Sequence, residues 1–166
     1  MAVALSVLLM LVNNILPVLM YVLPVATGFI VLFVSGLINK KWASGVFFAT
    51  TLLSFILVTE KEAVLTYVLF FGYYPLVRGY LQKLPKVISW VVKLLLFNCA
   101  VIMVGVIGVF VFGLPAEEYT EFGKITIPIL LLMADVVFIL YEMMIRKYSF
   151  LIEVVIRKFE KIVRLK

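Results

Sequence analysis

Residues 87–112 read VISWVVKLLLFNCAVIMVGVIGVFVF, with Lys93 as the one charged side chain in the stretch. A helix needs roughly 20 apolar residues to cross the hydrocarbon core of a bilayer, and this stretch is long enough. Its second half, Val101–Phe112, is apolar at odd and even positions alike, whereas the strands of a membrane barrel alternate apolar and polar residues. The stretch therefore predicts a transmembrane helix.

The rest of the chain has the same apolar character. Of its 166 residues, 66% are hydrophobic, against about 45–50% in a typical soluble domain. Apolar runs separated by short polar gaps predict five further helices: Ala2–Val12, Leu19–Ile38, Trp42–Val58, Lys61–Leu84 and Tyr119–Ile145. We therefore expect an all-α polytopic protein of the cell membrane with six transmembrane helices.

The charges in the gaps between these runs alternate in sign. The gaps at 39–41 and 78–86 are basic, as is the tail after residue 145, whereas the gaps at 59–62 and 115–124 are net acidic. Lys and Arg collect in cytoplasmic loops because their translocation is costly. The pattern predicts that both termini are cytoplasmic, and it accounts for the net charge of +6 without a nucleic-acid partner.

Residues 146–166 differ from the six runs. Apolar residues recur there at helical spacing among seven Lys and Arg residues, a pattern typical of a basic amphipathic helix. We expect a six-helix bundle at 1–145 and a cytoplasmic tail helix at 146–166. The tail either lies on the inner leaflet, extends the sixth helix or docks on a cytoplasmic partner.

Ionisable groups inside a membrane span are costly, so each is a functional hypothesis. Asp135 is expected near the midplane of the sixth helix, with Asn98 at similar depth on the fifth. A hydrogen bond between the two, or a shared ligand, fits these depths. Glu142 lies two turns from Asp135 on the same face, and we predict that it forms an ion pair with Lys93. Alternatively, both pairs only hold the two helices together.

Other polar groups mark the outer side. Asn14 in the first gap and Glu62 at the start of the fourth helix are candidates for the rim of an outward-facing pocket. The alternatives are ordinary turn chemistry for the asparagine and a helix-dipole interaction for the glutamate. Within the fourth helix, Gly72 and Pro75 interrupt an aromatic run, which predicts a kink that either lines a pocket or serves packing.

The sequence argues against an enzyme. It has no histidine and one cysteine, so His-based catalysis and the usual transition-metal ligand sets are missing. A phosphate-binding loop of the G-x-x-x-x-G-K-[ST] type is also missing, and Asp135 is the only aspartate. We expect no catalytic residue, no metal and no cofactor.

The overall plan resembles the S components of energy-coupling-factor transporters: six helices, cytoplasmic termini, a short first helix and prolines in the link to the second, Pro17 and Pro24. The stretch from Glu62 to Asn98 is also similar to uncharacterised membrane proteins of Firmicutes. Helix one carries Ala2-x-x-x-Ser6 where S components commonly have Ala-x-x-x-Ala, on the face that meets their T protein.

This resemblance implies a bacterial plasma-membrane subunit that captures a vitamin-like small molecule from outside and couples to a membrane T protein and two cytoplasmic ATPases. It places the pocket among helices one, four, five and six, where our candidates are Asn14, Glu62, Tyr67, Tyr74, Asn98 and Asp135. Two alternatives stay open: a membrane interaction or scaffold protein without a small-molecule ligand, and a stand-alone carrier of small solutes.

Overall fold

A computed structural model describes residues 1–113 and 126–164, with side chains to Tyr148 except at positions 17, 126, 127 and 130. Every regular element in these two ranges is a helix, which confirms the all-α class. The elements are α1 (Ala2–Val12), η1 (Pro17–Leu19), α2 (Val22–Leu37), α3 (Lys40–Leu57), α4 (Lys61–Thr66), η2 (Tyr67–Phe71), α5 (Tyr74–Leu81), α6 (Lys86–Phe112) and α7 (Thr126–Arg164).

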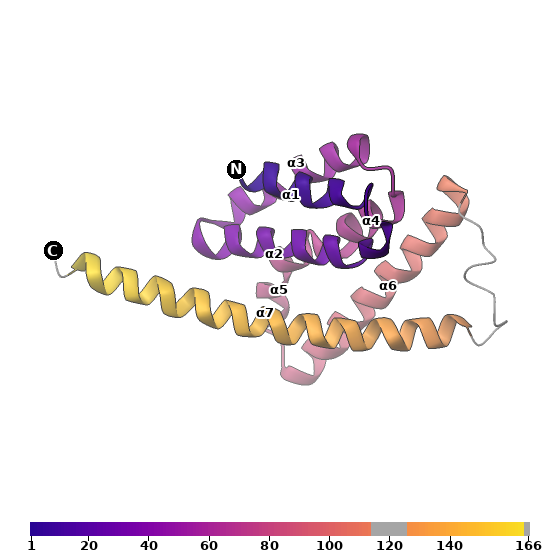
Figure 1. The fold of residues 1–166 in the computed structure, drawn as a ribbon. Coiled ribbons are helices and arrows are strands. Elements are labelled where there is room, and N and C mark those ends of the chain that lie inside the picture. Colours follow the sequence, from indigo (N-terminus) through magenta and orange to yellow (C-terminus); the bar gives the residue numbers. More distant parts are fainter. Residues whose placement is uncertain (114–125, 165–166) are drawn as a thin grey trace.

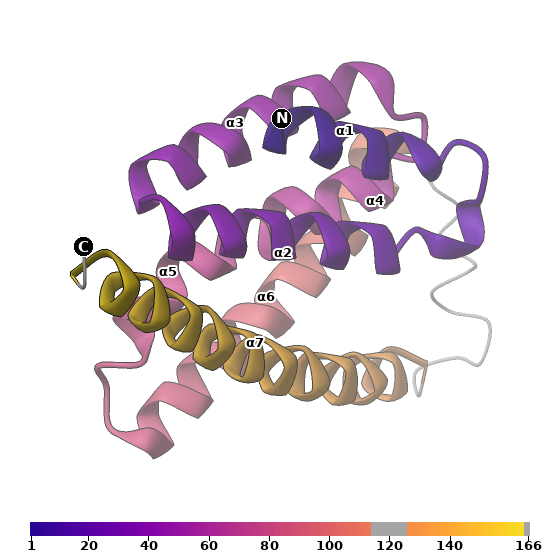
Figure 2. The same ribbon diagram turned by 60° about the vertical axis from the view of Figure 1, so that its left-hand side comes forward.

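The first three helices pack against one another, and α2 joins them to the rest of the fold. It contacts η2, α5 and α7, while α6 packs on α4 and α7 (Figure 1). From a second side, α1 and α3 lie side by side above α2 (Figure 2). The core has two parts, an aromatic cluster among α2, η2, α5, α6 and α7 and a second cluster under α1 and α3.

Helix lengths bear on the predicted spans. Within the described residues, α6 is long and apolar enough to cross a bilayer, and α1 and α2 are apolar but shorter. The 11 residues of α1 extend about 17 Å, roughly half of the 30 Å hydrocarbon core. The six-span arrangement therefore stays a prediction.

The predicted interruption of the fourth helix is present. Residues Tyr67–Phe71 form a π-helix, and the Gly72 amide donates a hydrogen bond to the Tyr67 carbonyl at 2.7 Å. Pro75 has no N–H, and its ring excludes a normal α-turn onto the carbonyl four residues earlier. The backbone forms one wider π-turn here, and α5 begins at Tyr74 after it.

The last helix is longer than expected. The predicted start at Tyr119 lies outside the described residues, but α7 continues without a break through residue 146 to Arg164. The tail is therefore an extension of the sixth helix, which was one of the three open alternatives. Its 39 residues span about 58 Å, and its C-terminal part projects beyond the other helices (Figure 1).

A close approach of two backbones joins the halves of the fold. A Cβ atom on Gly28 of α2 would lie 2.5 Å from the carbonyl oxygen of Phe71. Real contacts of this kind are never so short, so only glycine allows α2 and the π-turn to pack at this distance. By contrast, Gly105 of α6 has nothing within 4 Å of its Cβ position.

We therefore expect Gly28→Ala to lower the free energy of unfolding by about 1–3 kcal/mol, the usual cost of overpacking. Gly105→Ala is the matched control, since it adds the same methyl group to open space and gains helix propensity. Unfolding midpoints of both variants in lipid nanodiscs measure the difference. Equal stability of the two variants would contradict the close approach.

Candidate functional site

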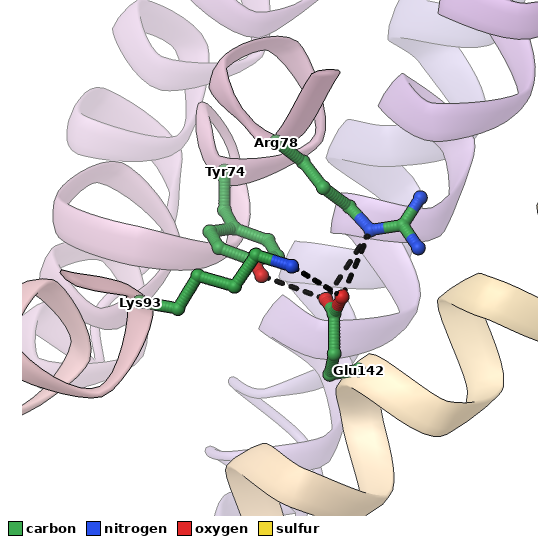
Figure 3. A network of polar contacts seen from close by, with 4 residues as sticks. All are labelled: Tyr74, Arg78, Lys93 and Glu142. Carbon is green, nitrogen blue, oxygen red and sulfur yellow. Dashed lines mark hydrogen bonds and ion pairs between the residues drawn. The ribbon is translucent and has the colours of Figure 1, made fainter. Parts of the chain in front are cut away.

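The carboxylate of Glu142 is the centre of a buried polar network (Figure 3). Its oxygens accept hydrogen bonds from the Tyr74 hydroxyl and the Lys93 Nζ, each at 2.7 Å. The Arg78 Nε lies 3.2 Å from Oε2. Glu142 and Tyr74 have 0% of their surface exposed, and Lys93 has 2%, so these contacts form away from solvent.

Three elements bring these groups together. Tyr74 and Arg78 lie one turn apart on α5, so both face the same neighbour. Lys93 comes from α6 and Glu142 from α7 (Figure 3). The π-turn determines where α5 begins, and through it the position of the tyrosine and the arginine.

Aromatic rings seal the network. Phe70 stacks on Tyr74 with ring centroids 4.7 Å apart, and Phe97 stacks on Phe138 at 4.9 Å. The Tyr141 ring lies edge-on to the Phe71 ring, with ring centroids 5.0 Å apart. Exclusion of water strengthens the interaction of Glu142 with its cations, and it also makes loss of one partner costly.

The predicted Lys93–Glu142 ion pair is present, and the sequence interpretation missed its other partners. Arg78 was grouped with the basic gap before residue 86, although it is buried with 5% of its surface exposed. Its spacing of four residues from Tyr74 is the signal in the sequence from which a shared helix face could have been predicted. Tyr74 was expected in a ligand pocket, and its hydroxyl donates a hydrogen bond to Glu142.

A second polar pair joins α6 and α7 at another level. The Asn98 Nδ2 donates to Asp135 Oδ1 at 2.8 Å and to the Leu94 carbonyl at 3.0 Å. Both side chains are half-buried, unlike the sealed Glu142. The hydrogen bond expected from their depths is present, and a ligand role stays a prediction.

The remaining candidates lie elsewhere. The Asn14 side chain donates to the Leu57 carbonyl at 3.2 Å and accepts from the Thr59 amide at 2.9 Å, contacts that fit the turn alternative. Glu62 accepts from the Tyr21 hydroxyl at 2.7 Å.

Tyr67 is fully buried in the cluster under α1 and α3. The six candidates therefore do not meet in one place. The structure brings Asn98 to Asp135, and it brings Asn14 and Glu62 to the same end of the fold.

The described residues contain no group of three or more His, Cys, Asp or Glu side chains that suits a metal ion. No family model, curated protein or solved structure matches this chain.

The Glu142 network predicts a large effect on stability. Glu142→Gln leaves the buried charges of Lys93 and Arg78 without their carboxylate, and such changes cost about 3–5 kcal/mol. Thermal or denaturant unfolding in nanodiscs measures this loss. Glu60→Gln, at a half-buried position with no hydrogen bond from its side chain at the α4 cap, is the control and should change stability by about 0.5 kcal/mol or less. A Glu142→Gln protein as stable as this control would contradict a structural role for the network.

Proposed function

We propose that the chain is a multi-pass membrane protein with six membrane-embedded segments. Large apolar side chains cover the outward faces of α3, α6 and α7. Soluble monomers rarely expose contiguous apolar patches larger than a few hundred Å², whereas lipid tails cover such faces readily. Examples of these exposed side chains are Phe48, Leu52, Ile56, Leu95, Phe110, Leu132, Met133 and Met143.

Contacts between the polar gaps support the predicted orientation, in which basic and acidic gaps lie on opposite sides of the membrane. Lys40, at the start of α3, has its Nζ atom 4.2 Å from the centre of the Tyr80 ring at the end of α5, and Lys83 lies near the same ring. At the opposite ends of these helices, Asn14 is bonded to Thr59. The basic gaps therefore share one end of the fold, as the positive-inside rule requires.

Labelling from one side of the membrane tests this orientation. In a Cys99→Ala background, we expect a membrane-impermeant maleimide to label Thr59→Cys in intact cells and Lys83→Cys only after permeabilisation. Both positions are exposed, so access depends on the side of the membrane. Labelling of both in intact cells, or the reverse pattern, would contradict the orientation.

We further propose that the protein captures a small molecule from the outer side and works with a separate membrane subunit and ATPases. The observation that supports this most is the Asn98–Asp135 pair, a carboxylate and an amide left half-buried among apolar side chains. Polar groups at such depth face a water-filled cavity or a partner. Each has hydrogen-bonding capacity beyond the bond that they share.

Replacement of the carboxylate tests the capture function. Asp135→Asn keeps the shape but loses the charge, and loss of a charge-assisted hydrogen bond weakens binding by about 10- to 100-fold. We expect the wild-type protein to release one metabolite at near-stoichiometric amount, measured by mass spectrometry, and the variant to release little at an unchanged unfolding midpoint. Met133→Leu, which alters an exposed position of α7, is the control. Loss of folding in Asp135→Asn would favour the purely structural alternative.

A scaffold function is the second candidate, and the length of α7 favours it. The helix projects beyond the bundle (Figure 1) and carries the basic segment that is suited to a cytoplasmic partner. Deletion of residues 149–166 separates the two functions. A capture subunit retains its metabolite and loses only its partners, whereas a scaffold has no metabolite to retain.

A further inference from the structure

The gap that joins α2 to α3 and the gap that joins α5 to α6 meet at one end of the fold. Lys40 begins α3, and its Nζ atom lies 4.2 Å from the centre of the Tyr80 ring on α5. Lys83, in the gap after α5, has its Nζ atom 5.9 Å from the centre of the same ring. Two ammonium groups from distant parts of the sequence therefore converge on one aromatic side chain.

The local structure positions both lysines. Lys40 lies in the first turn of α3, and α3 packs against α5. A Cβ atom on Gly79 of α5 would lie 3.1 Å from the Lys40 Nζ atom, so the glycine leaves the lysine room to lie across α5. After α5 the chain turns back, because the Lys83 amide donates to the Tyr80 carbonyl at 3.1 Å. The second lysine is thereby brought to the ring.

Neither lysine has an anionic partner among the residues whose side chains the structure describes. In that part of the chain the ion pairs belong to Glu142, which binds Arg78 and Lys93. A cation–π contact explains one lysine on a ring, whereas a second cation at the same ring is repelled by the first. An anion that contacts both ammonium groups would offset this repulsion.

Both lysines lie on the open surface. Lys40 and Lys83 are exposed, and the Tyr80 ring has 63% of its surface exposed. An anion can therefore reach the two ammonium groups from outside, and it needs no cavity in the core.

Apolar side chains beside the lysines are exposed as well. They flank Lys40 and follow Lys83 in the sequence: Leu37, Ile38, Trp42, Leu84, Val87 and Ile88. Tryptophan is typical of the level where a membrane meets water. A ligand that fits this surface is amphiphilic, because its anionic group contacts the lysines while its apolar part covers their neighbours.

The apolar neighbours distinguish between possible anions. A free phosphate or another small soluble anion would contact the lysines and leave the apolar side chains uncovered. An anionic phospholipid has both a charged headgroup and acyl chains, and clusters of basic residues beside a membrane attract such lipids.

We propose that Lys40, Lys83 and Tyr80 form a binding site for the headgroup of an anionic phospholipid, whose acyl chains lie on the neighbouring apolar side chains. The bound headgroup links the start of α3 to the end of α5. This inference rests on the proposed membrane location, and the proposed orientation makes the lipid one of the inner leaflet. It does not depend on the capture function.

Native mass spectrometry of the protein in detergent micelles tests the site. The probe is dioctanoyl phosphatidylglycerol, and dioctanoyl phosphatidylcholine, with the same acyl chains and no net charge, is the lipid control. The test variant combines Lys40→Gln with Lys83→Gln. The matched control combines Lys41→Gln with Lys86→Gln, which removes the same charge from the same end at exposed positions.

We expect the wild type and the control variant to bind phosphatidylglycerol at least about 10-fold more tightly than phosphatidylcholine. The test variant should bind phosphatidylglycerol about 10- to 30-fold more weakly than the wild type, the effect of two lysines at a lipid headgroup, and should lose its preference between the lipids. Millimolar inorganic phosphate should not compete, because it has no apolar part.

Three results would overturn the proposal. Equal binding of both lipids by the wild type would assign this surface to apolar contacts alone. Equal loss of phosphatidylglycerol in the two double variants would indicate general attraction by positive charge. Competition by inorganic phosphate would indicate a site for a soluble phosphate compound. Should the test variant unfold at a lower midpoint than the control variant, Lys83→Gln alone is compared with Lys86→Gln.

Failure of this site and failure of the proposed orientation give different results. Binding in micelles does not depend on which side of a membrane each gap faces. Reversed labelling of Thr59→Cys and Lys83→Cys together with the expected lipid preference would contradict the orientation and support the site. The expected labelling without a lipid preference would contradict the site alone.

Discussion

The buried carboxylate of Glu142 is the contact on which the C-terminal half of the fold depends. It joins α5, α6 and α7 through Tyr74, Arg78 and Lys93, and the aromatic cluster packs around these contacts. In the membrane that we propose as its environment, helix association gains little from the hydrophobic effect, and polar contacts between helices contribute more to the choice of neighbours. Because Glu142 shares its carboxylate among three donors, it specifies that α5, α6 and α7 pack together, and it fixes their positions along one another.

This arrangement was partly predictable. The apolar run at 87–112 indicated α6 almost to the residue, and the depths of Lys93, Glu142, Asn98 and Asp135 indicated the two contacts between α6 and α7. Depth along a helix follows from counting residues at a fixed rise. Contacts between residues on neighbouring long helices can therefore be predicted from sequence alone.

The missed features depend on geometry that residue counts do not contain. The π-turn lies before α5, and Arg78 of α5, which was grouped with a basic gap, is buried in the core. Tyr67 and Tyr74, seven residues apart in one aromatic run, end in different clusters because this turn lies between them. Tyr67 and Tyr74 were both candidates for the predicted pocket, and the turn lies between them.

The contacts around Glu142 are connected to the N-terminal half of the fold through α2. Each carboxylate oxygen of Glu142 has a donor, so loss of one partner leaves a charge buried and is costly. Gly28 brings α2 against the π-turn, and α2 also packs on α1 and α3. A change in the packing of α2 would therefore act on the same turn that precedes Tyr74 and Arg78.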